Sequence, residues 1–166
     1  MLERSARPRQ FVSFLVNGRL FGFDIRMIKE ITPTAPITPV PLKKRDVSGV
    51  VNIRGQVVVV LDISLSLGGK EQKITGDSQV IIMKNILELE AISDFTPTFD
   101  PEAIGIIPVG FLVDSVGEVV TADLDSIEDA PSHLIARYRH FVEGVVRQEA
   151  MPMVILDAGA ILEAGR

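Results

Sequence analysis

The sequence has no cysteine and no tryptophan, and it contains only one tyrosine and two histidines among 166 residues. Without cysteine there is no disulfide and no thiolate metal site, which fits a reducing compartment. No apolar run approaches the roughly 18 residues of a membrane-spanning helix, and the N-terminus lacks the apolar core of a secretory signal. The formal net charge of −5 disfavours general nucleic-acid binding. These absences predict a cytoplasmic protein that binds no nucleic acid and does not insert into the membrane.

Patterns that carry catalysis or metal binding are also scarce. His133 and His140 are seven residues apart without other ligand spacing, so we expect solvated or structural roles. Gly68-Gly69-Lys70 lacks the earlier glycine of a phosphate-binding loop. Asp62 and Asp157 could be paired carboxylates, but each follows an apolar strand just before a turn, where aspartate caps the next element. We therefore expect no enzyme, no metal and no cofactor.

The feature that is present is an internal repeat. Gly49 and Gly144 each begin a Gly-Val-Val run that reaches an aspartate thirteen residues later, at Asp62 and Asp157. A second pair of segments agrees in the same order: Phe21-Gly22-Phe23 leading to Glu30-Ile31, and Val109-Gly110-Phe111 leading to Glu118-Val119. Two matched pairs in one order predict two similar β modules.

The two copies differ in the middle of their second segments. The first has Asn52-Ile53-Arg54-Gly55, and the second has Arg147-Gln148-Glu149-Ala150. Positions that both copies share are explained by the fold, so the tetrapeptide that differs is where we look for function.

Composition and turn residues predict a first module made of strands over 11–16, 20–23, 47–51 and 56–63. Asn17-Gly18 is the preferred type I′ hairpin turn, and Arg54-Gly55 is the turn of the second hairpin. The continuous apolar run over 57–61 argues for burial on both faces. Four prolines within 32–41 exclude a helix there and predict an extended loop.

The second module is predicted to begin with a strand over 80–83, followed by an insert at roughly 86–106. The insert contains five acidic residues and no basic residue: Glu88, Glu90, Asp94, Asp100 and Glu102. Loops of this length are functional or disordered, so a mobile loop without a role and a partner-specific contact both stay open. Its ends should lie close together, as in a hairpin. Residues 158–164 are predicted to form a short C-terminal helix.

Arg54 is the residue that most favours an interaction role. It is the sole charge in the apolar stretch from Val47 to Leu61, and Gly55 after it frees the backbone to turn. Arginine is enriched at interface hot spots, because its planar fork makes bidentate bonds to carboxylates. Glu30 is the candidate partner within the chain, and the alternative is an ordinary exposed charge.

Four blocks of sequence agree with one known family. They are Phe21-Gly22-Phe23-Asp24-Ile25 with Ile28-Lys29-Glu30-Ile31, Gly49-Val50-Val51-Asn52-Ile53-Arg54-Gly55 with Val57 to Asp62, Gly110 to Asp114 with Val116, and Gly144-Val145 with Leu156-Asp157. Over Phe11 to Leu162, outside the insert, the chain resembles the CheW-type chemotaxis coupling proteins. The Gly-Val-x-Asn-x-Arg-Gly block is the specific part of the match.

The resemblance implies a mainly β fold of two SH3-like five-stranded β-barrel subdomains that share a hydrophobic core, with short helices including one at the C-terminus. We expect a flexible basic arm over 1–10 and a CheW-like domain over 11–166. Within the domain, subdomain one covers about 11–69, subdomain two about 78–157 and the C-terminal helix about 158–164. The subdomain boundaries can interleave.

The resemblance also implies a non-catalytic adaptor. Such proteins bridge the cytoplasmic tip of methyl-accepting chemoreceptors to the regulatory domain of a CheA-type histidine kinase, so recruitment to membrane-associated receptor arrays is expected. The receptor-facing groove of the family corresponds to Ile28, Glu30, Gly49, Asn52 and Arg54. Two alternatives stay open: a CheW-like scaffold in a motility or pilus signalling system outside chemotaxis, and a barrel that binds a small ligand in the cleft between the subdomains.

Overall fold

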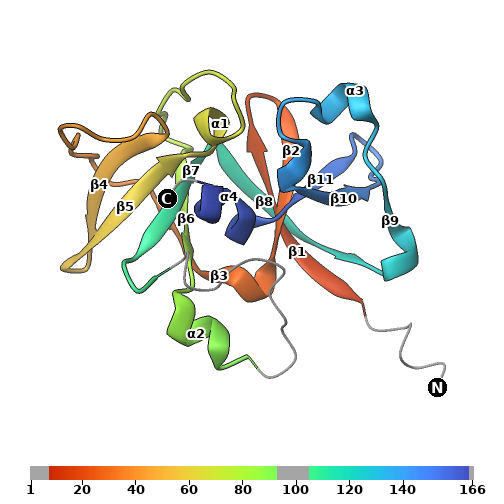
Figure 1. Cartoon of the computed structure of the whole chain (residues 1–166), viewed down its shortest axis with the longest axis horizontal. Helices are drawn as coiled ribbons and strands as arrows, with labels where there is room; N and C mark the ends of the chain where they lie inside the picture. The colour runs from red at the N-terminus through yellow and green to blue at the C-terminus, as the bar shows by residue number, and fades with distance from the viewer. Residues whose placement is uncertain (1–7, 93–104, 165–166) are drawn as a thin grey trace.

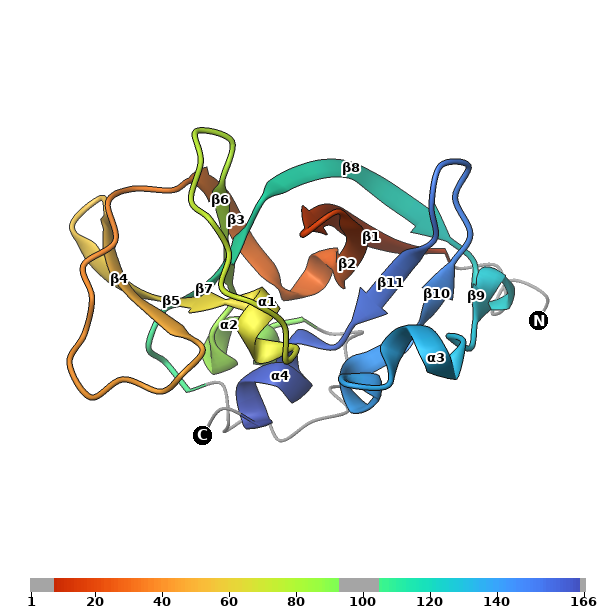
Figure 2. The same ribbon diagram turned by 90° about the horizontal axis from the view of Figure 1, so that it is seen from above.

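The computed structural model describes residues 8–92 and 105–164, and its strands form two sheets that lie side by side (Figures 1 and 2). The strands are β1 (Arg9–Val16), β2 (Arg19–Asp24), β3 (Ile28–Pro33), β4 (Val47–Ile53), β5 (Gln56–Asp62), β6 (Gln79–Met83), β7 (Val109–Val113), β8 (Ser115–Ala122), β9 (Ile127–Glu128), β10 (Val142–Val146) and β11 (Met153–Leu156). The α-helices are α1 (Ile63–Ser66), α2 (Ile86–Glu90), α3 (Ser132–Ile135) and α4 (Ala158–Ala164), and the 3-10 turns are η2 (Ile25–Met27), η4 (Leu124–Ser126) and η5 (Arg139–Phe141).

The two halves of the chain exchange their first hairpins. The six-stranded sheet has the order β8-β1-β2-β11-β10-β9, and the five-stranded sheet has the order β3-β6-β7-β5-β4. Hairpin β1–β2 therefore lies between strands of the second half, and hairpin β6–β7 lies between strands of the first half. Each junction contains one parallel pair, β2 with β11 and β5 with β7. Strands from both sides of residues 70–77 contribute to each sheet. The two sheets are therefore interleaved along the sequence.

Both sheets carry the same row of glycine, aliphatic residue and glycine across three neighbouring strands. The rows are Gly49–Val60–Gly110 and Gly144–Ile155–Gly22. A Cβ on Gly110 would lie 2.4 Å from Val80 Cγ1, and one on Gly22 would lie 2.7 Å from Met153 Sδ. At both glycines, the side chain of a neighbouring residue fills the space that a Cβ would need. The repeat predicted from the sequence is thereby confirmed as a structural repeat.

The difference between five and six strands is a difference of one residue pair. In the six-stranded sheet, β9 pairs with β10 through two residue pairs, Glu128 with Val145 and Ile127 with Val146. In the five-stranded sheet, the corresponding place holds a single bridge between Thr38 and Val50, with N–O distances of 2.8 and 2.9 Å. The prediction of two similar small β units is confirmed, with sheets of five and six strands.

A shared core joins the sheets. Phe14 and Phe23 of the six-stranded sheet have ring centroids 4.8 Å apart, and Phe23 lies 5.2 Å from Phe111 of the five-stranded sheet. Helix α4 lies between the sheets (Figure 1) and buries Ile161 in the same cluster. Smaller clusters fill each sheet separately, one with Val51, Val58, Val60, Val80, Ile82 and Leu112, the other with Phe11, Ala122, Val146, Met153 and Ile155.

Two expectations about strands need correction. Strand β1 begins at Arg9, so the last two residues of the expected flexible arm belong to a sheet, and residues 1–7 lie outside the described ranges. The run over 57–61 is not buried on both faces: Val57 is 56% exposed, and burial alternates along β5. A strand next to the sheet edge has one face open to solvent even when its sequence is entirely apolar.

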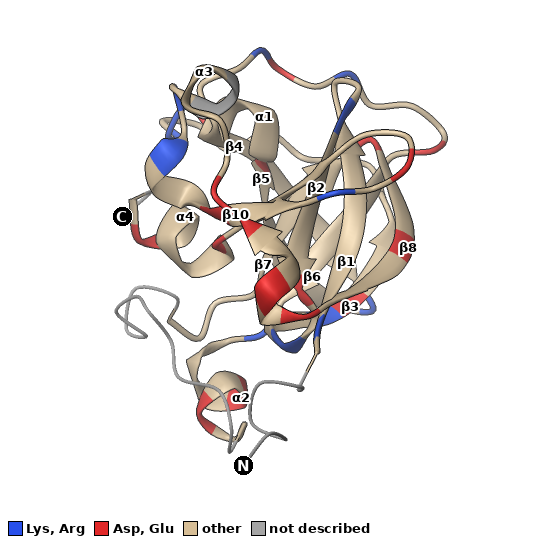
Figure 3. Cartoon of the chain, turned by 90° about the vertical axis from the view of Figure 1, so that its right-hand side faces the viewer, with Lys and Arg blue, Asp and Glu red and all other residues tan. Residues whose placement is uncertain are grey.

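The start of the insert is a short helix. Asn85 and Glu88 form a capping box at the start of α2, and Leu89 packs into the shared core. The Ile86 amide donates to the Gly105 carbonyl at 3.0 Å, so the prediction that the ends of the insert lie close together is confirmed. Figure 3 marks the acidic positions of α2 in red. The remainder of the insert, residues 93–104, lies outside the described part of the chain.

Candidate functional site

The tip of hairpin β4–β5 is held in one conformation by its own residues. Arg54 has φ 52° and Gly55 has φ 84°, and two successive positive φ values are what a type I′ turn requires. The Asn52 side-chain oxygen accepts a hydrogen bond from the Gly55 amide at 2.8 Å. A non-glycine residue with positive φ is uncommon, so the asparagine bond stabilises the backbone that presents Arg54.

Arg54 contacts Glu30 across the end of the five-stranded sheet. Its Nη2 donates to both carboxylate oxygens of Glu30, at 2.6 Å to Oε1 and 2.5 Å to Oε2. Glu30 lies on β3 and Arg54 follows β4, and these are the two outermost strands of that sheet. The pair therefore bridges the two edges of the sheet. The prediction that Glu30 is the partner of Arg54 within the chain is confirmed.

The ion pair is exposed to solvent, and both of its members stay charged. The Arg54 side chain is 71% exposed and that of Glu30 is 29% exposed. The hydrogen bond from Arg54 lowers the pKa of Glu30 below its usual value, with a smaller contribution from the charge of Lys29. The same hydrogen bond raises the pKa of Arg54. A second ion pair lies beside the first, with Lys29 Nζ 3.3 Å from Glu88 Oε2.

Beneath the ion pair lies a hollow of about 30 Å³ that is lined by residues of β3, the β4–β5 tip, α2 and Pro108. Sites for small molecules usually have about 300–1,000 Å³, so this hollow is too small to hold a ligand.

Four large apolar side chains in the segments that carry the pair or line the hollow are each more than half exposed: Val57, Leu87, Ile106 and Ile107. Val57 is the cross-strand partner of Asn52. Glu88 and Pro108 line the hollow, and Leu87 and Ile107 are the residues that precede them in the chain. Exposed apolar groups with a polar rim mark protein-interaction surfaces. We call these four residues, with Glu30, Asn52 and Arg54, the Arg54 surface.

Ile28 and Gly49 lie below the Arg54 surface. Ile28 is buried in the shared core opposite Met83. Gly49 has φ 150°, and a Cβ there would lie 2.3 Å from the Thr38 carbonyl oxygen. The structure thus brings three of the five predicted site residues together at the surface. It gives the other two packing roles that support β3 and β4.

The second hairpin tip carries an ion pair of its own. Arg147 Nε lies 2.7 Å from Glu128 Oε2, and both side chains are largely exposed. Glu128 belongs to β9, the strand next to β10, whereas Glu30 belongs to the opposite edge of its sheet. The two tips therefore share a fold and differ in where the charges are placed, as the differing tetrapeptides indicated.

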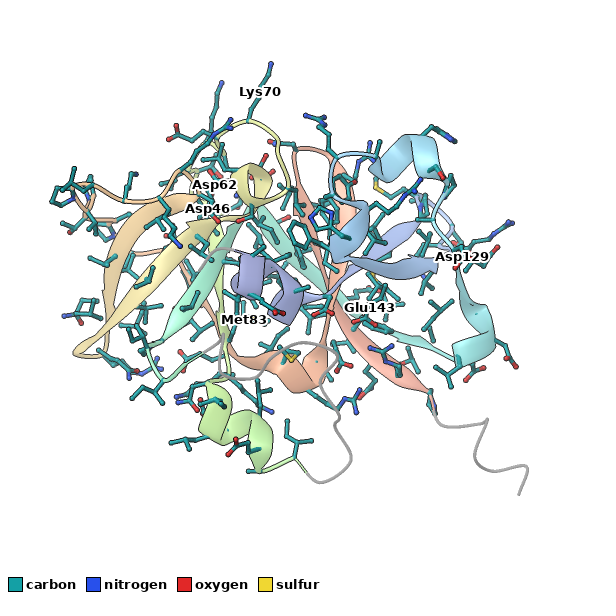
Figure 4. All side chains as sticks on the ribbon, viewed as in Figure 1. Asp46, Asp62, Lys70, Met83, Asp129 and Glu143 are labelled. Atoms are coloured by element: carbon teal, nitrogen blue, oxygen red, sulfur yellow. The ribbon has the colours of Figure 1, made fainter. Side chains whose placement is uncertain are left out.

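The remaining candidates for chemistry have structural roles. Asp62 and Asp157 accept hydrogen bonds from Leu65 N at 3.2 Å and from Ala160 N at 3.0 Å, so the predicted caps of α1 and α4 are confirmed (Figure 4 labels Asp62). His133 and His140 are exposed. Within residues 8–92 and 105–164, no group of three or more His, Asp or Glu side chains is placed to hold a metal ion. In the same ranges, no helix is long and apolar enough to cross a membrane.

Sequence reasoning missed two polar clusters. Gln72, in the segment between α1 and β6, is buried, and its side-chain amide donates to Asp62 Oδ1 at 2.8 Å. Arg9 lies 2.9 Å from Asp24 and 3.0 Å from Glu143, the latter labelled in Figure 4. Neither cluster has a local signal, because the partners lie far apart in the chain. The apolar members of the Arg54 surface were missed because an apolar residue is read first as core.

Comparison with known proteins supports the family. The model of the CheW-like domain matches residues 10–166. Chemotaxis protein CheW of Bacillus subtilis is 29% identical over 154 residues, which cover 93% of this chain and 86% of that protein. Chemotaxis protein CheW of Thermotoga maritima is 28% identical over 167 residues, covering 98% of this chain and 93% of that protein.

A solved structure supports the fold. The crystal structure of the scaffolding protein TtCheW from Thermoanaerobacter tengcongensis superposes with a TM-score of 0.71 at 24% sequence identity, covering 93% of this chain and 88% of that one. The domain match spans nearly the whole sequence, and the two exchanged sheets agree with it in architecture. This chain belongs to the CheW-like family.

Proposed function

We propose that this chain couples the cytoplasmic tip of methyl-accepting chemoreceptors to the regulatory domain of a CheA-type histidine kinase. Its family gives it an adaptor role in chemotaxis signalling. The two named partners and the absence of catalysis are our inference from that role and from the geometry of the site. Recruitment to receptor arrays at the membrane would follow from receptor binding.

The receptor-facing groove in this proposal presents Glu30, Asn52 and Arg54 at the surface, and Ile28 and Gly49 are packed beneath them. The observation that carries it is the Arg54–Glu30 pair, which is exposed and held by a turn, and whose neighbouring chain segments carry exposed apolar side chains. An arginine whose backbone is already held in place loses little conformational freedom on binding. Interfaces place such arginines beside apolar contacts, where exclusion of water strengthens their bonds.

In this proposal the coupling involves no covalent step. The adaptor offers one surface to the receptor and another to the kinase, and the signal passes as a change in the relative geometry of the bound partners. Transient signalling contacts bury less than about 1,200 Å² in total, so each contact alone is weak. Many copies in one array supply the remaining affinity through a high effective concentration.

The test is a pair of titrations of purified protein, one with the kinase regulatory domain and one with a soluble receptor-tip fragment. We expect saturable binding to both, and Arg54→Ala should weaken receptor binding by about tenfold or more while leaving kinase binding unchanged. Arg147→Ala is the matched control, because it removes the exposed ion pair of the equivalent hairpin. Equal losses in both variants would overturn the assignment of the receptor face.

A folded protein that binds no CheA-type kinase would overturn the proposed partners. That result would favour the alternative, a CheW-like scaffold in another motility or pilus signalling system. A thermal unfolding curve for each variant separates loss of binding from loss of the fold.

A further inference from the structure

A groove of about 380 Å³ lies on the molecule away from the Arg54 surface. It is bordered by the β1–β2 turn, α1 and the segment from His133 to Tyr138. Figure 1 shows the β1–β2 turn between α1 and α3 at the top of the molecule, and Figure 4 labels the nearby Lys70 at this end. The Arg54 surface adjoins α2, which lies at the bottom of the same view.

The lining of this groove is basic in an acidic protein. Its charged side chains are Arg19, at the start of β2, and Arg137, after α3, and the imidazole of His133 also lines it. None of its lining residues is Asp or Glu. Asp114, which does not line the groove, accepts a hydrogen bond from the backbone amide of Asn17 at 2.7 Å. The whole chain has a net charge of −5, so the groove differs in sign from the protein around it.

Hydrogen bonds hold the side chains that line the groove. Arg137 Nη1 donates to the Gly68 carbonyl at 3.0 Å, and Arg19 Nη1 donates to the Tyr138 hydroxyl at 3.4 Å. Asn17 Nδ2 donates to Ser64 Oγ at 2.9 Å and so ties the β1–β2 turn to α1. A guanidinium has five N–H donors, and one bond to a carbonyl positions Arg137 without exhausting its capacity. The cations are thus placed before any partner arrives.

The groove also has an apolar floor. Val16, Phe21 and Leu67 contribute to its lining and are otherwise buried. Cations beside an apolar floor match a chain segment whose acidic side chains flank an apolar one, because carboxylates pair with guanidinium groups while the apolar side chain covers the floor.

We propose that this groove binds an acidic peptide segment of a partner protein, as a second interaction surface that does not depend on the receptor-facing groove. Paired charges give such a contact its orientation and its rate of association more than its affinity. The contact should therefore weaken as salt is added.

The probe is a fluorescein-labelled twelve-residue peptide of alternating glutamate and leucine, and the matched control replaces each glutamate by lysine. Fluorescence anisotropy measures binding to the full chain at low salt and at about 0.15 M salt, where the screening length is about 8 Å. The key variant is Arg19→Glu with Arg137→Glu. The control variant, Arg45→Glu with Lys73→Glu, makes the same change in net charge at exposed positions that do not line the groove.

We expect the acidic peptide to bind and the basic one not to bind. The groove variant should weaken binding at least about tenfold, while the control variant and Arg54→Ala should change it less than about twofold. A variant with Arg19→Lys and Arg137→Lys, which keeps the charges, should retain most of the binding. Equal losses in the groove and control variants, or no binding of the acidic peptide at low salt, would overturn the proposal. Loss with Arg54→Ala would place the peptide on the receptor face instead.

Discussion

Gly49 and Gly144 hold equivalent places in the two sheets. Each lies next to the backbone segment that pairs with the outer strand of its hairpin. A Cβ on Gly49 would lie 2.3 Å from the Thr38 carbonyl oxygen, and one on Gly144 would lie 2.9 Å from that of Glu128. Each glycine follows a shift in strand register. This shared glycine is why the repeat is visible in the sequence, and it explains Gly49 by the fold before any partner is considered.

Substitution of these glycines should therefore damage the fold. Gly49→Ala meets backbone at a distance that no Cβ tolerates and also has φ 150°, so we expect a loss of about 3 kcal/mol or more in the free energy of unfolding. Gly144→Ala should cost less, because the backbone atom that its Cβ would meet lies further away, at 2.9 Å against 2.3 Å, and because Gly144 does not have a positive φ. Denaturant titration measures both.

The control for this comparison is Gly18→Ala. Gly18 has φ 79° with open space around it, so its substitution should cost only about 1 kcal/mol. A stable Gly49→Ala variant that had lost receptor binding alone would contradict the packing explanation and make Gly49 a contact residue.

Glu30 and Arg54 should act as a unit in receptor binding. Either Glu30→Ala or Arg54→Ala removes the pair, so the double variant should bind receptor tips about as weakly as the weaker single variant rather than showing the sum of both losses. Both groups are exposed to solvent, so thermal midpoints should barely change. Additive binding losses, or unfolding of Arg54→Ala, would show that the pair does not couple or that it is structural.

Acid should weaken the contact between β1 and its neighbours through Asp24. Burial opposes ionisation of Asp24, but hydrogen bonds from Arg26 and Arg9 outweigh it, so its pKa lies below the usual value. A lowered folded pKa contributes stability above the unfolded pKa of about 3.9 that is lost as pH falls through the folded value. Asp24→Asn should cost about 3 kcal/mol at pH 7 and should flatten the decline of stability below about pH 4.

Glu143 should behave in the opposite way. Burial raises its pKa despite the pairing with Arg9, so its favourable contribution belongs to the protonated form and is lost as pH rises through the folded pKa. Glu143→Gln should therefore lower stability at pH 7 less than Asp24→Asn does. Urea titrations of both variants at pH 7 and pH 3.5 test the ranking, and a larger loss for Glu143→Gln would contradict it.

Deletion of residues 87–104 should keep the fold and lower its stability. The chain can be rejoined because Ile86 N lies 3.0 Å from Gly105 O. The cost comes from Leu89, which is only 4% exposed, and loss of a buried leucine costs about 2–5 kcal/mol. Leu89→Ala should reproduce most of that loss in thermal and denaturant unfolding. Complete unfolding of the deletion variant alone would show that the insert is required for folding.

The sequence predicted the features that depend on neighbouring residues or on repetition. The Asn17-Gly18 turn, the caps at Asp62 and Asp157 and the Arg54–Glu30 pair all match the structure. Helix α2 also had a local signal that was overlooked, since Asn85 with Glu88 is a capping box.

Other features depend on which strands become neighbours, and local patterns do not determine that. The predicted burial of 57–61 on both faces was wrong, because β5 lies one strand from the sheet edge. The bond between Gln72 and Asp62 forms only because the segment after α1 folds back beside β7, where the Gln72 amide also donates to the Leu112 carbonyl at 2.8 Å. No single segment of the sequence predicts the exchange of hairpins, because it involves strands from both halves of the chain.

That exchange gives the adaptor its stiffness. Two barrels joined by a tether could tilt against each other, as domains with small interfaces do by default. Here the backbone ladders β2–β11 and β5–β7 join the two halves of the chain inside each sheet, so separating the halves would require breaking main-chain hydrogen bonds. The chain passes between the sheets through two short links, residues 25–27 between β2 and β3 and Asp114 between β7 and β8. A chain cut within 70–77 would yield two fragments that each lack the hairpin closing their own sheet, and that can regain a complete fold only by finding each other.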